Sequence, residues 1–190
     1  SVTAGIVAPT GREDDPDLLQ DIAFGDGQWD VFFELGGGYH LSSNLLVNSF
    51  FRYTYQLPTE KELRVPHSSE VNISAFKDYF DEKLGNIFMY NINSEFMVND
   101  WISVIGAYEY HYKEENSYES SRIESNDILA VNSDYTKHNL RFSLELSSVN
   151  LFQKKEFLLP GKITIGYQNT FSGMNTPKLR QYEIEFRMFF

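Results

Sequence analysis

Apolar and polar side chains alternate strictly at the carboxyl-terminal end of the chain. Every second position there is apolar and the positions between hold glutamine, glutamate or arginine; the apolar residues are Tyr182, Ile184, Phe186, Met188 and Phe190. Successive side chains of a β-strand point to opposite faces. The pattern therefore predicts a terminal strand with one apolar face and one charged face.

The same alternation recurs along the chain. It is found in residues 28–41, 45–57, 86–98, 101–113, 139–147 and 162–169. Residues 1–9 are apolar with a weaker alternation, and we count them as a further strand. With the terminal strand the pattern predicts an all-β chain of about eight strands. Their lengths lie near the roughly 9–11 residues that a tilted transmembrane strand needs.

The connections between these segments alternate in length. Residues 42–44 and 99–100 are tight turns, whereas residues 10–27, 58–85 and 114–138 are long and polar. Short turns on the periplasmic side and long loops on the other side are typical of outer-membrane barrels. The sequence thus predicts an antiparallel up-and-down transmembrane β-barrel, with residues 1–190 as a single domain.

One connection departs from this rule. Residues 148–161 fall on the short-turn side of the predicted barrel, yet they are long. We expect this segment to extend the flanking strands or to dock a partner.

The terminal strand also resembles the last strand of bacterial outer-membrane β-barrel proteins. In those proteins the final aromatic residue belongs to a signal read by the barrel assembly machinery, so the resemblance implies that the alternating apolar residues of residues 182–190 form this signal. The aromatic content of 16%, with 12 Tyr and 16 Phe, agrees with girdles of aromatic residues at the lipid interfaces. A soluble lipocalin-like barrel is the alternative. It would alternate too, but its apolar face would surround a ligand.

Composition narrows the classes of function. Charged residues make up 23% of the chain, and no stretch approaches the roughly 20 apolar residues of a transmembrane helix. The net charge of −11 argues against a nucleic-acid partner. No signal peptide is visible, so we expect the numbering to begin at a mature or truncated start.

If the apolar faces contact lipid, the intervening polar faces line the interior. The eleven charged residues on these faces are Glu34, Arg52, Glu95, Glu109, Lys113, Arg141, Glu145, Lys162, Glu183, Glu185 and Arg187. Buried charges must pair, and eight strands enclose a space that side chains just fill. We therefore expect a salt-bridged plug. The functional alternative is a selective polar pathway, which requires more strands or a second subunit.

Negative charge concentrates in the long connections. Acidic runs are usually solvated surface. Asp14, Asp15 and Asp17 nevertheless offer the oxygen ligands that Ca²⁺ or Mg²⁺ prefers, and such a cation would bridge the protein to lipopolysaccharide. The cluster lacks the spacing and the bidentate glutamate of an EF-hand loop. We therefore expect no metal and no cofactor, and keep these residues as a weak candidate only.

Catalytic motifs are incomplete. His40 with Ser42 and Ser43 is similar to the His-x-Ser arrangement of lipid A deacylases, and His138 near Asp134 is similar to the Asp-His pair of an outer-membrane protease. Neither arrangement supplies a nucleophile, a base and an orienting group together. We expect no enzymatic activity.

A second resemblance rests on residues 5–30. Gly5, the run Pro9-Thr10-Gly11 and the motif Gly25-x-Gly27-x-Trp29-Asp30 resemble the transporter-like outer-membrane proteins associated with aromatic-compound degradation, the phenol meta-pathway group, which is distantly FadL-like. The resemblance implies an uptake barrel for small hydrophobic or aromatic molecules. Members of this group are usually longer, so the chain is expected to be a reduced relative or the carboxyl-terminal part of a larger barrel.

The sequence therefore predicts a transporter-like or porin-like protein of the bacterial outer membrane that acts on small molecules. The expected partners are outer-membrane lipid, lipopolysaccharide and the barrel assembly machinery. The alternative is a closed structural barrel that anchors or scaffolds a complex, in which case other envelope proteins are partners as well.

Overall fold

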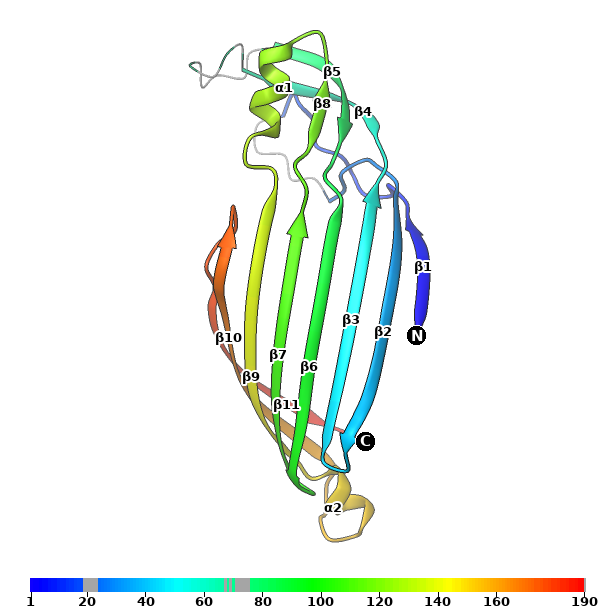
Figure 1. Ribbon diagram of the computed structural model, residues 1–190, viewed down its shortest axis with the longest axis vertical. Helices are drawn as coiled ribbons and strands as arrows, with labels where there is room; N and C mark the ends of the chain where they lie inside the picture. The colour runs from blue at the N-terminus through cyan, green and yellow to red at the C-terminus, as the bar shows by residue number, and fades with distance from the viewer. Residues whose placement is uncertain (19–23, 67, 69, 71–75, 190) are drawn as a thin grey trace.

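Two antiparallel sheets make up most of the protein (Figure 1). The computed structural model describes residues 1–18, 24–66, 68, 70 and 76–189. The large sheet has the order β1-β2-β3-β6-β7-β9-β10-β11. Its strands are β1 (Val2–Val7), β2 (Asp30–Ser42), β3 (Leu45–Gln56), β6 (Ile87–Asn99), β7 (Ile102–Lys113), β9 (Tyr135–Ser147), β10 (Gly161–Met174) and β11 (Arg180–Met188).

The large sheet confirms the prediction of eight antiparallel strands in up-and-down order. Two strands are longer than the alternation indicated: β9 begins at Tyr135 rather than 139, and β10 continues to Met174 rather than 169. A register shift between Thr170 and Ser172 interrupts the β9–β10 ladder in this extension. Because a bulge adds one unpaired residue, it breaks the two-residue period and hides the end of the strand from the sequence.

The two ends of the large sheet differ (Figure 1). The tight turns between β2 and β3 and between β6 and β7 lie at one end, which we call the short-turn end. The opposite end, the long-connection end, carries a small sheet of β4 (Thr59–Val65), β5 (Phe76–Lys83) and β8 (Ser117–Glu119), beside α1 (Ile123–Ala130). The connection from β9 to β10 lies at the short-turn end and contains α2 (Val149–Gln153).

The small sheet corrects the prediction that residues 58–85 and 114–138 are merely long polar connections. It has its own core: Val65 and Phe80 are fully buried, and they are the buried hydrophobic residues in the described part of the chain. β5 pairs with β8 across more than thirty residues, with Glu82 opposite Tyr118. A pairing this distant leaves no local signature in the sequence.

The large sheet is open within the described residues. β1 pairs with β2 from Asp30 to Leu35, and Ser1 forms backbone hydrogen bonds with Gly36; the edge of β2 beyond Gly36 has no pairing with β1. β11 pairs with β10 along Gly161 to Asn169. No described residue joins β1 to β11, so the predicted barrel closure is not observed. The sheet is strongly curved, and β10 and β11 pass behind the other strands in Figure 1.

The predicted terminal strand is β11, which ends at Met188. Four of its alternating apolar residues lie in this strand or at its end, whereas Phe190, the last member of the expected assembly signal, lies outside the described residues. In the part of the chain that the structure describes, no helix has the length and apolar character needed to cross a membrane.

Truncating the core of the small sheet should loosen that sheet alone. We expect Phe80→Ala to destabilise β4, β5 and β8 by about 3–5 kcal/mol, because it deletes a fully buried aromatic side chain. Hydrogen exchange should then lose protection in β4 and β5 while β6 and β7 keep theirs. Tyr79→Ala is the matched control, since Tyr79 is 60% exposed on the same strand. Equal loss from both variants would show that Phe80 is not the core.

Candidate functional site

The candidate site is the polar face of the large sheet. In an antiparallel pair, residues directly opposite each other share a face. Glu34 lies opposite Arg52 on β2 and β3, and Thr164 lies opposite both Glu145 and Glu185 on β9 and β11. Followed across every ladder, the register brings all eleven predicted interior charges to this one face.

Ion pairs, between strands and within β11, join most of these charges. An Arg52 guanidinium nitrogen lies 3.1 Å from a Glu34 carboxylate oxygen, and an Arg141 nitrogen lies 2.8 Å from Glu183. Direct ion pairs also join Lys162 to Glu145 and Arg187 to Glu185. Lys113, at the end of β7, instead donates to the Ser133 carbonyl oxygen at 2.9 Å. The structure therefore pairs acids with bases across β2–β3, β9–β10 and β9–β11, and within β11.

Neutral side chains connect the charges into a network that the charge pattern did not reveal. Asn91 and Asn139 donate to the Glu109 carboxylate at 3.4 and 3.2 Å, and Thr170 donates to the Asn139 side-chain oxygen at 2.7 Å. Asn139 and Thr170 are buried. The signal available in the sequence was the recurrence of asparagine at polar positions, as in Asn91 and Asn93.

The polar face is hollowed between β6 and β11. The hollow has a volume of about 340 Å³ and is lined mainly by charged, amide and hydroxyl side chains, among them Asn91, Glu95, Glu109, Arg141, Glu145, Lys162 and Glu185. Acids and bases both line it. Such a lining can hold water or a small polar solute.

The opposite face of the large sheet is apolar and exposed. Tyr182 is 83% exposed and Ile184 is 78% exposed, whereas Glu145 on the polar face is 7% exposed. The exposed apolar residues on this face include Val31, Phe33, Leu35, Tyr39, Leu41, Phe96, Val104, Phe142, Leu144, Ile163, Ile165 and Phe186. Burial is thus reversed relative to a soluble sheet, which covers its apolar face.

Aromatic side chains form a row across this apolar face toward the long-connection end. Ring centroids lie 4.7 Å apart for Tyr53 and Phe88, 5.8 Å for Phe88 and Tyr112, and 4.9 Å for Tyr110 and His138. Trp101 lies at the short-turn end of the sheet. Val104 and Leu144 lie in the band between, together with Phe142.

The weak metal candidate in the first long connection has another role for one of its members. Asp17 pairs with Arg64 on β4 at 2.6 Å and with Lys77 on β5 at 2.8 Å. Hydrogen bonds from Lys77 and then Arg64 hold the pKa of Asp17 below its ordinary value. Among the described residues, no group of three histidine or acidic side chains is arranged to hold a metal. Part of the acidic run is therefore tied to basic residues of the small sheet.

The candidate catalytic histidine has different neighbours from those expected. His138 shares a hydrogen bond of 2.8 Å with the Tyr108 hydroxyl through its Nδ1 atom. Asp134, its predicted partner, accepts a hydrogen bond from the Asn175 side chain at 2.9 Å. The structure thus brings His138 into the aromatic row rather than into a catalytic pair.

Comparison with known proteins identifies no relative: no protein-family model matches the chain, and no curated protein matches it significantly. The resemblances to outer-membrane barrels and to the phenol meta-pathway group stay predictions.

The ion pairs of the polar face should differ in their contribution to stability. Glu145 is nearly buried with Lys162 as its partner, so Lys162→Met should lower the free energy of unfolding by about 3 kcal/mol. The matched change Arg187→Met breaks a more exposed pair and should cost clearly less. Urea titration in lipid vesicles measures both. An equal loss would mean that the carboxylate of Glu145 is freely solvated.

Proposed function

We propose that this chain forms a membrane-embedded β-barrel wall in the bacterial outer membrane and lines a passage for small molecules. The observation that carries the proposal is the reversed burial of the large sheet. Charged side chains such as Glu145 and Glu34 are sheltered and paired, while apolar side chains such as Tyr182, Ile184 and Leu144 are exposed. An apolar surface of this extent is stable when lipid covers it.

The arrangement of the apolar face supports this orientation. Contacting aromatic rings form a row near one end, Trp101 lies at the other, and the band between holds aliphatic residues and Phe142. Interfaces of membrane barrels concentrate aromatic residues in the same way. The short-turn end then faces the periplasm and the small sheet faces the cell exterior. Lipid, lipopolysaccharide and the barrel assembly machinery are the partners that this location implies.

Closure of the wall follows from the same proposal. A sheet edge in lipid leaves unsatisfied backbone groups, each costing several kcal/mol. The free edges of β1 and β11 therefore pair in the membrane, either with each other or through further strands. Closure through further strands makes a wider barrel, in which the polar face lines a water-filled passage. The mixed charges of this face suit polar solutes. The resemblance to the phenol meta-pathway group adds small aromatic molecules as a second solute class.

A structural barrel is the second candidate, and the ion pairs favour it. Arg141 reaches Glu183 across an intervening strand, and Lys162 reaches Glu145. If the eight strands close on one another, side chains such as these fill the interior. The protein then anchors an envelope complex and conducts nothing.

Membrane embedding predicts an asymmetry between two adjacent residues of β11. Ile184 is 78% exposed on the apolar face, so Ile184→Arg should weaken folding into vesicles by about 2–4 kcal/mol. Glu185 lies on the polar face, so Glu185→Gln should cost less. Urea titration of both variants in vesicles decides between the orientations. If Ile184→Arg is the milder change, the apolar face does not contact lipid.

The passage itself is tested by conductance in planar bilayers. We expect single-channel steps from the purified protein, and Glu109→Gln should shift the ion selectivity toward anions because it removes a negative charge from the hollow. Tyr108→Phe is the control, because Tyr108 lies on the other face of β7 and should leave selectivity unchanged. Proper insertion without conductance would reject the passage in favour of the structural barrel.

A further inference from the structure

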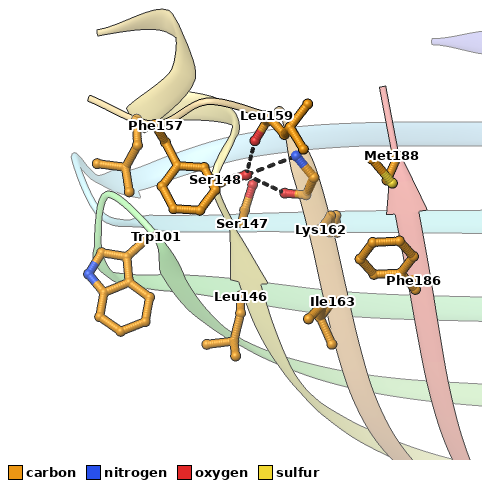
Figure 2. Close-up of a pocket in the computed structure, with 12 residues that line it drawn as sticks. Trp101, Leu146, Ser147, Ser148, Phe157, Leu159, Lys162, Ile163, Phe186 and Met188 are labelled. Carbon is orange, nitrogen blue, oxygen red and sulfur yellow. Dashed lines mark hydrogen bonds between the residues drawn. The ribbon is translucent and has the colours of Figure 1, made fainter. Parts of the chain in front are cut away.

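An apolar groove lies on the exposed face of the large sheet at the short-turn end (Figure 2). Its volume is about 440 Å³, within the roughly 300–1,000 Å³ typical of ligand sites. The sheet contributes Leu146, Ile163 and Phe186, and the connection from β9 to β10 contributes Phe157 and Leu159. Trp101 closes one side. The side chains that bound the space are mostly hydrocarbon, so its chemistry fits an aliphatic chain rather than a polar solute.

Ser148 holds the connection over the sheet. Its hydroxyl donates to the Leu159 carbonyl oxygen at 2.7 Å and accepts from the Gly161 backbone nitrogen at 2.8 Å (Figure 2). The backbone nitrogen of Ser148 also donates to the Gly161 carbonyl oxygen at 2.9 Å. Farther along, Lys154 forms an ion pair with Asp100 in the turn between β6 and β7. These bonds tie both ends and the middle of the connection, so the groove is a fixed feature of the fold.

The connection also carries basic charge beside exposed apolar residues. Lys154 is followed by Lys155, and Leu158 is 91% exposed. Lys155 has a φ of 62°, a left-handed conformation that costs a residue with a Cβ more than it costs glycine. Lys155 thus occupies a position that glycine would adopt without strain. Its neighbours in the chain are Lys154 and one acidic residue, Glu156. Lys155 stands two residues before Phe157, which lines the groove. An apolar groove beside a basic stretch of chain is complementary to a lipid with an anionic headgroup.

We propose that the groove binds one acyl chain of an anionic phospholipid, with Lys155 contacting the phosphate. The inference rests on the proposed membrane embedding, which brings the short-turn end to the inner leaflet of the outer membrane. The occupant is a lipid of that leaflet, since the groove opens on the apolar face that lipid covers. Residues 148–161, the long connection that departs from the short-turn rule, then form the outer wall of a lipid site.

Trp101 provides a direct reporter of the occupant. The chain has 2 tryptophans, and Trp29 precedes β2 at the long-connection end. In a Trp29→Phe background, bromine atoms on a lipid acyl chain quench Trp101 fluorescence on contact. The protein is reconstituted in dioleoyl phosphatidylcholine vesicles that contain a small fraction of brominated phosphatidylglycerol, or the same fraction of brominated phosphatidylcholine.

We expect the brominated phosphatidylglycerol to bind about fivefold more tightly than the phosphatidylcholine, the ratio given by about 1 kcal/mol per basic side chain at an anionic surface. Lys155→Gln should abolish this preference. Lys178→Gln, a matched change in the exposed connection between β10 and β11, should leave it intact.

Larger side chains in the groove distinguish lipid bound in the groove from lipid that merely contacts the protein surface. Leu146 and Ile163 are opposite each other within the groove, and Leu144 and Ile165 form the next such pair outside it. Leu146→Phe with Ile163→Phe should reduce the selective quenching to the phosphatidylcholine level, whereas Leu144→Phe with Ile165→Phe should not. If the filled variant does not fold, the Lys155→Gln comparison still decides.

Two outcomes overturn the inference, and they are distinct from failure of the proposed function. Equal quenching by both minor lipids, or equal effects of the two phenylalanine pairs, would leave the groove without a lipid preference, as expected if a second copy or a peptide fills it. No quenching even when all of the phosphatidylcholine is brominated would instead reject membrane embedding, and the lipid site with it.

Discussion

The antiparallel hydrogen-bond ladder is the constraint on which the other properties of the large sheet depend. A slip of one residue in any ladder would exchange the two faces of a strand. With the observed register, Glu34 meets Arg52, and Thr164 lies between Glu145 and Glu185. The same register collects Tyr53, Phe88 and Tyr112 on the opposite face. One set of pairings thus produces both the charged network and the aromatic row.

The charges of the polar face explain why the large sheet needs no hydrophobic core. Side chains there are sheltered from solvent by their neighbours, and a sheltered charge is tolerated when it is paired. Glu145 has Lys162, Glu183 has Arg141, and Glu109 accepts from two asparagines. The apolar residues are therefore free to face outward. That arrangement costs free energy in water through the hydrophobic effect and is favourable in lipid.

The sequence predicted the eight strands and their faces because the two-residue period is a local property of each strand. It did not predict the small sheet, since β5 finds β8 through contacts between distant segments and its core rests on Val65 and Phe80. The groove was missed for a similar reason: Trp101, Leu146 and Phe186 belong to separate parts of the chain. The local pattern also could not show whether the edge strands β1 and β11 pair, because closure of the sheet depends on strands far apart in the sequence.

Under the proposed function, the change in burial between the two sheets marks where the chain passes from lipid to water. At the end of β3, the buried residues are Thr54 and Gln56, and in β4 the buried residue is Val65. The interior of the small sheet is dry: burial raises the pKa of Glu82, and it raises the pKa of Tyr118, which lies opposite, to about 12. Within about ten residues the buried side chains change from polar to apolar. This change is expected where a strand leaves lipid and enters water. The proposed membrane boundary therefore lies near residues 57–58, at the base of the small sheet.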